Sequence, residues 1–137
     1  CFKAYDKALA YNDENILVLN NYAYFLSLLD RELLVAMNYA TTANKLSPNN
    51  ATYLDTLAWV MHRVGSNEEA KRIMQQALSI DGQRDPDLLA HYGDILWALG
   101  EKFMAETYWK KAVERGYDSQ RMEEHIAQLK AEPKHDK

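Results

Sequence analysis

The sequence has little of what several protein classes depend on. It contains one cysteine in 137 residues, which excludes an internal disulfide framework. Its 20 aspartates and glutamates outnumber its 16 lysines and arginines, and the basic residues form no cluster, so nucleic acid is not expected as a partner. The longest apolar runs, 16–19 and 22–29, are shorter than the roughly 18 to 20 residues of a membrane-spanning helix, so no membrane span is predicted.

Patterns typical of catalytic sites are also missing. The five glycines are scattered and form no phosphate-binding loop. Asp87, His91 and Asp94 are spaced to lie on one face of a helix and could share a metal ion, but such a set on a surface helix is more typical of a solvated face. Residues 123–125, Glu-Glu-His, are likewise expected on the solvated side of a helix. We therefore predict no catalytic residues, no metal and no cofactor, and a protein that is not an enzyme.

The one cysteine is the first residue, where mature bacterial lipoproteins carry an acylated cysteine. Cys1 precedes Ala8 by 7 residues, just as Ala36 precedes Ala43. The segment 2–5 is amphipathic, whereas a lipid-bearing cysteine is normally followed by a polar tether. We therefore favour a small packing residue of a helix over a lipid anchor, and expect the chain to be a fragment of a longer repeat protein.

What the sequence does contain is a repeat of 34 to 35 residues. Small residues recur in three sets, each marking one position of a repeated unit: Ala23, Ala58 and Gly93; Ala36, Ala70 and Ala105; Ala43, Ala77 and Ala112. A period in this range is typical of stacked-repeat proteins, in which each unit buries its apolar face against the next. Closely packed helices need Ala or Gly at their contact, because a larger side chain overpacks it. The three sets therefore predict where helices pack.

Each unit is predicted to be two amphipathic helices joined by a tight turn. In the second unit the apolar residues of each helix recur at helical spacing: Leu54, Leu57, Ala58 and Met61, then Ala70, Met74, Ala77 and Leu78. Gly65 is predicted to end the first helix in the left-handed conformation, and Asn67 to cap the second. One extra residue falls near 29–31 and another within 81–85, so we expect the array to bend irregularly at both places.

The pattern resembles the tetratricopeptide repeat over about residues 1–117. The matching residues are Leu57-Ala58, Ala70 and Ala77 in the second unit, Tyr92-Gly93, Ala105 and Ala112 in the third, and Ala43 with Pro48 in the first. The departures are Asp13, Gly82 and Tyr117 at the terminal proline position, and Ala40 where a larger residue is usual. The segment 53–60 is similar to bacterial members of the family. The resemblance implies an all-α fold, a right-handed superhelical solenoid of antiparallel helix pairs.

We expect a single domain built from six consecutive segments. They are the second helix of an incomplete leading repeat at 1–15, repeats at 16–50, 51–85 and 86–117, a capping helix at 118–131, and a disordered tail at 132–137.

The resemblance also implies a binding face, because the first helix of each pair lines the concave side in this family. The predicted groove residues are Asn20, Tyr24 and Ser27 in the first unit, Asp55, Trp59 and His62 in the second, and Asp87, Asp94 and Trp97 in the third. Aromatic side chains supply contact area and polar groups fix register, and the acidic members favour a basic partner. Alternatively, Trp59 or Trp97 packs against a neighbouring hairpin or is covered by the terminal helix.

A variant of this family holds the carboxylate of a chaperone tail with Lys, Asn and Arg. The corresponding positions here carry Asn20, Asn21, Tyr24, Thr56, Asp87 and His91, so that clamp is absent and an acidic tail is not expected as ligand. We predict a non-catalytic protein interaction scaffold that binds a peptide or helix in its groove. The alternatives are a structural spacer, a segment that self-associates as a homodimer through Phe2 and Tyr5 of the N-terminal helix, and an accessory of a metal-assisted hydrolase.

Overall fold

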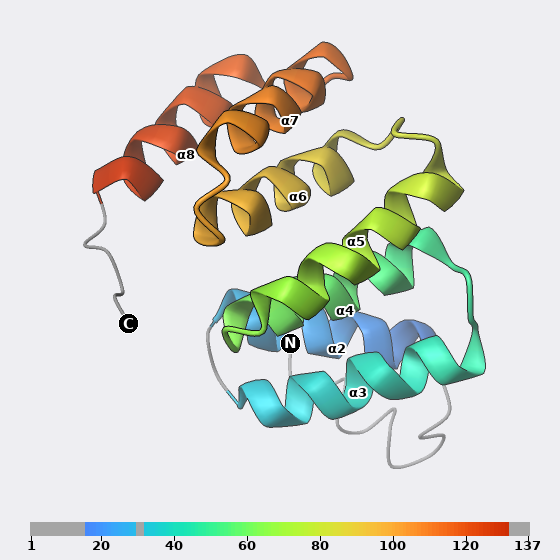
Figure 1. Ribbon diagram of the computed structural model, residues 1–137. Helices are drawn as coiled ribbons and strands as arrows, with labels where there is room; N and C mark the ends of the chain where they lie inside the picture. The colour runs from blue at the N-terminus through green and yellow to red at the C-terminus, as the bar shows by residue number, and fades with distance from the viewer. Residues whose placement is uncertain (1–15, 30–31, 132–137) are drawn as a thin grey trace.

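The computed structural model describes residues 16–29 and 32–131, and over these residues all regular structure is helical. The helices are α2 (Ile16–Leu28), α3 (Leu33–Leu46), α4 (Ala51–Arg63), α5 (Asn67–Asp81), α6 (Pro86–Ala98), α7 (Lys102–Glu114) and α8 (Ser119–Ala131) (Figure 1). The predicted leading helix at 1–15 and the tail at 132–137 lie outside the described residues.

The helices form three consecutive hairpins, α2 with α3, α4 with α5 and α6 with α7, followed by α8 packed on α7. Helices α2, α4 and α6 also contact one another in that order, whereas contacts between α3, α5 and α7 are absent from this part of the chain. The row α2, α4, α6 is therefore the tighter side of the stack. We call the surface of this row the inner face.

The recurring small residues lie where the helices pack, as predicted. The eight alanines of the three sets are fully buried, and Gly93 is buried with them. A Cβ atom at Gly93 would lie only 2.5 Å from Nε1 of Trp109 and closer still to its Cδ1. Trp109 occupies the repeat position that is Ala40 in α3 and Met74 in α5. The largest side chain of the second helices thus faces the one glycine of the first helices.

The turns between helices follow the predicted chemistry with one correction. Gly65 has a φ of 94°, in the left-handed region that glycine adopts readily. The prediction that Asn67 caps α5 is wrong, because the helix begins at Asn67 and Ser66 holds the cap position. The side chain of Asn67 accepts a hydrogen bond from His62 Nδ1 at 2.6 Å instead. The Asn67 side chain thus links the end of α4 to the start of α5.

The long connection before α6 is held by aspartates. Asp81 Oδ2 accepts hydrogen bonds from the backbone N–H groups of Arg84 and Asp85, each at 2.8 Å. Asp85 in turn caps α6 by accepting from the backbone N–H of Asp87 at 2.9 Å. Pro86 occupies the first helical position, where its missing N–H has no cost. The extra residue of this connection is therefore accommodated in an ordered turn.

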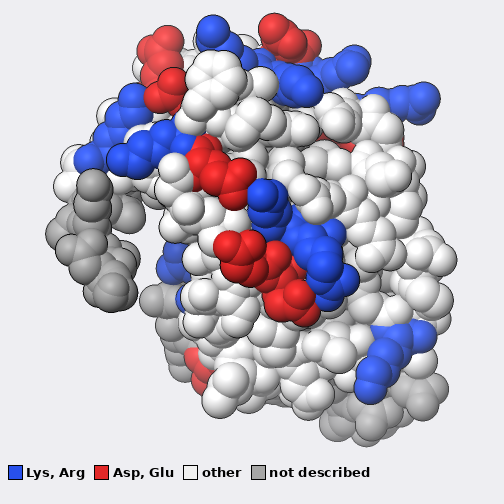
Figure 2. All heavy atoms as spheres, in the orientation of Figure 1, with Lys and Arg blue, Asp and Glu red and all other residues white. Residues whose placement is uncertain are grey.

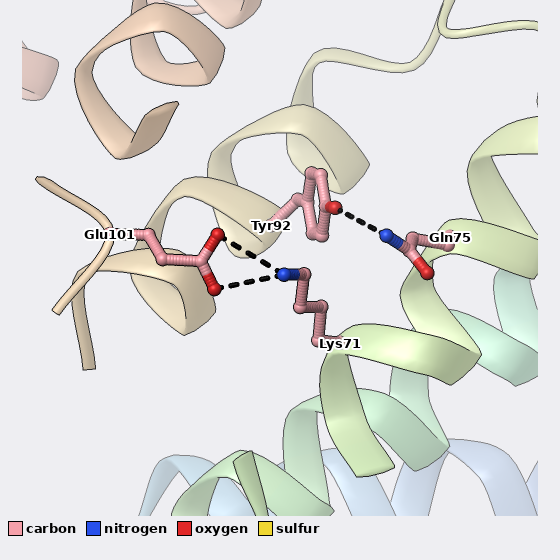
Figure 3. Close-up of polar contacts among 4 residues, drawn as sticks. All are labelled: Lys71, Gln75, Tyr92 and Glu101. Atoms are coloured by element: carbon pink, nitrogen blue, oxygen red, sulfur yellow. Dashed lines mark hydrogen bonds and ion pairs between the residues drawn. The ribbon is translucent and has the colours of Figure 1, made fainter. Parts of the chain in front are cut away.

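Polar contacts fix the register of the second hairpin on the third. Lys71 Nζ donates to both carboxylate oxygens of Glu101, at 3.1 and 2.8 Å, and Gln75 Nε2 donates to the hydroxyl of Tyr92 at 3.1 Å (Figure 3). Lys71 and Gln75 lie one turn apart on α5. The ion pair is partly exposed, so it contributes only about 0 to 1 kcal/mol.

The face of the molecule that carries α5 has no single sign of charge. Figure 2 shows positive and negative side chains interleaved in a strip across the middle of this face, where α5 lies in Figure 1. In the described part of the chain, no helix is both long and apolar enough to cross a membrane.

Candidate partner-binding face

The inner face contains a recess of about 240 Å³ at the junction of α2, α4 and α6. Three helices contribute its walls: Asn20, Asn21 and Tyr24 from α2; Thr52, Asp55 and Thr56 from α4; and Asp85, Asp87, Leu88 and His91 from the start of α6. We call this hollow the recess. It exists because the first turn of α6, capped by Asp85, stands beside α2 and α4.

A second hollow, of about 320 Å³, is larger but less suited to selective binding. It is lined by Gln83, Lys111, Glu114 and Arg115. These are long, flexible side chains of which two are exposed, and none is apolar. Ordering such side chains around a ligand costs conformational entropy, so the recess is the better candidate.

An ion pair links α4 and α6 beside the recess. His91 Nδ1 lies 2.8 Å from Asp55 Oδ1, and both side chains are largely buried. Burial by itself lowers the pKa of His91, but the charge and hydrogen bond of Asp55, with the charges of Asp94 and Asp87, outweigh burial and raise the pKa above 6.5. His91 Nδ1 donates to Asp55, because a carboxylate can only accept.

The rings of two histidines lie close to Trp59. The His91 ring stacks on it, with ring centres 4.4 Å apart and planes at 27°, and the His62 ring lies 4.9 Å away. Burial lowers the pKa of His62 below 6.5, although the hydrogen bond to Asn67 opposes this shift. The two imidazole rings pack against the indole and hold Trp59 in place. Tyr24 lies farther out, 6.3 Å from the His91 ring.

Two buried polar atoms of the inner face have no hydrogen-bond partner among the described residues. They are Oδ1 of Asn20 and Nε1 of Trp59. Asn20 is only 6% exposed and lines the recess. A buried polar atom without a partner costs about 1 to 3 kcal/mol, and native proteins keep few of them. An atom of this kind is completed by a water molecule or by a ligand that reaches it.

The C-terminal end of the inner face is closed. Asp94 Oδ1 accepts hydrogen bonds from Trp109 Nε1 at 2.9 Å and His125 Nε2 at 2.8 Å, and its Oδ2 also lies 2.8 Å from His125 Nε2. The predictions that Asp94 faces an open groove and that His125 is solvated on the outside are both wrong. Helix α8 brings His125 over Asp94, which is 6% exposed.

Two further predicted groove residues are not on an open surface. Ser27 is fully buried, and its hydroxyl donates to the backbone oxygen of Tyr24 at 2.6 Å. Trp97 is half-buried, with Nζ of Lys102 4.9 Å and Nζ of Lys130 5.8 Å from its ring. Lys130 belongs to α8, so the alternative that the terminal helix covers this tryptophan describes it better than an open groove.

The other predicted residues fall into two groups. Asn20, Tyr24, Asp55 and Asp87 line the recess. Trp59 and His62 are outside its lining, where Trp59 stacks on the lining residue His91 and His62 lies next to Trp59. The metal set Asp87, His91 and Asp94 is not assembled, because His91 pairs with Asp55 and Asp94 with His125. Within the described ranges, no three His, Cys, Asp or Glu side chains come together as metal ligands.

The recess also contains residues outside the predicted groove set. Asn21, Thr56 and His91 share one position, two residues before the small residue of each first helix. This 35-residue recurrence is a signal that could have found them. Asp85 and Leu88 enter through the start of α6, which no repeat pattern marks.

Comparisons with known proteins agree with this architecture. No family model matches the chain. A curated TPR repeat-containing protein of Pseudomonas aeruginosa is 32% identical over 88 residues, which are 63% of this chain and 14% of that protein. PilF of Pseudomonas aeruginosa is 24% identical with a TM-score of 0.69, over 88% of this chain and 54% of that one. YrrB, a TPR protein with an unusual peptide-binding site, is 28% identical with a TM-score of 0.69, over 87% of this chain and 60% of that one.

The sequence match and the solved structures support a tetratricopeptide-repeat family protein. The chain spans about 14% of the curated relative and 54% and 60% of the two solved chains. MamA, at 17% identity and a TM-score of 0.68, has the same fold. Tetratricopeptide-repeat proteins are in general scaffolds for protein–protein interaction and are typically non-catalytic. The comparisons therefore support the general expectation of a scaffold with a protein or peptide partner.

Proposed function

We propose that the inner face binds a peptide segment or helix of a partner protein, and that the recess is the centre of the contact. Tyr24 and Trp59 supply aromatic contact area, and Asp55 and Asp87 supply polar contacts that fix the register of the segment. The single observation that carries the proposal is the recess, whose lining includes Asn20 with its buried and unpartnered Oδ1.

Charge supports a basic partner. The open part of the inner face carries Asp55 and Asp87, and among the described residues of α2, α4 and α6 the only Lys or Arg is Arg63 at the end of α4. Opposite charge on the partner would speed the encounter and fix its orientation. The likeness to YrrB, which has a peptide-binding site, is a further support for the class of ligand.

Self-association through Phe2 and Tyr5 stays a prediction, because both residues lie outside the described residues. The structural spacer remains the alternative function. A spacer would bind no peptide on its inner face, so one set of binding measurements distinguishes the two functions.

The test is selection of peptides from a displayed library against the whole chain, followed by calorimetry with the selected peptides. Tyr24→Ala should weaken binding about tenfold or more, because aromatic residues at the centre of a contact supply most of its energy. Phe103→Ala is the matched control, since Phe103 is an exposed aromatic of α7. Circular dichroism melts check that both variants fold. The proposal fails if no peptide binds, or if Phe103→Ala weakens binding as much as Tyr24→Ala does.

A further inference from the structure

The lining of the recess carries more acidic than basic groups. It includes three carboxylates, of Asp55, Asp85 and Asp87, no lysine or arginine, and one imidazole, that of His91. Asp85 is engaged in capping α6, and Asp55 in its pair with His91. Asp87 is exposed at the rim, and its carboxylate forms no hydrogen bond with the described residues. Because Asp55 is paired with His91, Asp85 and Asp87 are the carboxylates whose negative charge no basic group of the lining balances.

A second and independent observation points to a ligand in the same place. Asn20 is one of the residues that line the recess, it is 94% buried, and its Oδ1 finds no donor among the described residues. Acidic side chains on a surface need no explanation beyond solvation, but a buried carbonyl oxygen without a partner does. The group that completes it must be a donor.

The electrostatics of Tyr24 agree with the sign of that donor. Burial raises the pKa of Tyr24, and the carboxylates of Asp55 and Asp87 raise it further, while Arg121 of α8 opposes them. The negative charges thus prevail over the arginine at the mouth of the recess. A positive group entering there gains from the same potential that disfavours the phenolate.

We propose that the recess is a subsite for the cationic end of one lysine or arginine side chain of the bound segment. The ammonium and guanidinium groups carry only donors, which matches a wall of acceptors. Asn20 Oδ1 and the Asp87 carboxylate receive these donors, and Tyr24 and Leu88 flank the aliphatic stem. This proposal rests on the proposed function in one respect: the lysine or arginine belongs to the segment that the inner face binds.

Small probes test the subsite without a known partner. The whole chain is titrated with methylguanidinium, methylammonium and the neutral methylurea at constant ionic strength, and the Asn20 side-chain amide is followed by NMR. We expect saturable shifts with at least one of the two cations and none with methylurea. The stronger of the two cations identifies arginine or lysine as the residue. Equal shifts with methylurea would overturn the subsite.

Three variants sharpen the titration. Asp87→Asn should weaken cation binding roughly threefold to fivefold, because it removes one partly screened charge. Asn20→Leu, followed through Tyr24 and Thr56, should weaken it tenfold or more, because it removes a buried hydrogen bond to a charged group. Glu69→Gln, an exposed residue of α5 away from the recess, is the charge-matched control and should change nothing. Unchanged affinity in both recess variants would contradict the proposal.

The peptides selected for the inner face distinguish the cation subsite from the proposed peptide-binding function. Replacing their basic residue by norleucine or citrulline should reduce affinity tenfold or more. If the peptides bind the inner face but tolerate every neutral replacement, the subsite is refuted and the proposed function stands. If no peptide binds while methylguanidinium still saturates the recess, the proposed function is refuted and the subsite stands.

Discussion

The two ends of the inner face treat their buried polar atoms in opposite ways. At the C-terminal end, the Asp94 carboxylate accepts hydrogen bonds from Trp109 and His125. In the recess, Asn20 Oδ1 is as deeply buried but has no partner among the described residues, and Trp59 Nε1 is also unpaired. Asp94 and Trp59 occupy the same position of successive repeats.

The difference teaches how one repeat position serves two purposes. Where α8 folds back over the stack, the inner-face residue becomes part of a closed polar network that stabilises the end of the array. Where no described helix covers the face, the equivalent surface keeps unpaired atoms and negative charge. Repeat arrays need a terminal unit that closes the last apolar face, and here the closure is partly polar.

The largest expected change in stability comes from a substitution at the closed C-terminal end of the inner face. Asp94→Leu should lower the free energy of unfolding by about 2 to 5 kcal/mol, because it leaves Trp109 Nε1 and His125 without their acceptor in a buried place. Urea denaturation followed by circular dichroism measures this loss. A change of less than about 1 kcal/mol would mean that the network does not stabilise the closed end.

The next effect concerns the packing that positions Trp109. Gly93→Ala should lower the free energy of unfolding by about 1 to 3 kcal/mol, since the new Cβ displaces the indole, although alanine is the better helix former by about 1 kcal/mol. In a Trp109→Met background the same change should be neutral or stabilising, because Met74 already faces Ala58 at the equivalent place. A double-mutant cycle without this change of sign would refute the steric account.

Much of this packing could be predicted from the sequence, because it depends on local periodicity. The helix faces and the small residues at their contacts follow from spacings of three, four and 35 residues. The burial of Ser27 did not follow, because its hydroxyl is satisfied by the backbone of its own helix. The role of Asn67 depended on a neighbouring imidazole, which no capping rule includes.

The candidate site was only half predictable. The position of Tyr24 and Asp55 on the inner face follows from the repeat. The pair of Asp94 with His125 joins residues 31 apart, and α8 does not share the repeat period, so no pattern in the sequence places one over the other. The pair of Asp55 with His91 spans 36 residues, one more than the repeat, and this spacing is a usable signal for future repeat sequences.

Changes in pH are expected to have smaller effects on the folding stability. In the folded chain His91 should titrate above pH 6.5 and His62 below it. The stabilisation from His91 is complete below pH 6.5 and is lost as the pH rises through its folded pKa, whereas that from His62 is complete above pH 6.5 and is lost as the pH falls through its folded pKa. Together they favour greatest stability near pH 6.5.

NMR titration of the two imidazoles measures both pKa values directly. His91→Gln should remove the loss of stability at higher pH, and His62→Gln the loss at lower pH, so each variant is the control for the other. A His91 that titrates below 6.5 would mean that burial outweighs Asp55, and the ion pair beside the recess would then be absent at neutral pH.

The smallest expected change in stability is also the most direct test of the central claim, that the recess keeps an unpaired acceptor for a ligand. Asn20→Leu removes that acceptor and keeps the size of the side chain. The free energy of unfolding should stay the same or rise by up to about 1 to 2 kcal/mol, because nothing in the described structure bonds to this oxygen, while binding of the selected peptides falls tenfold or more. Lost stability with unchanged binding would contradict the account.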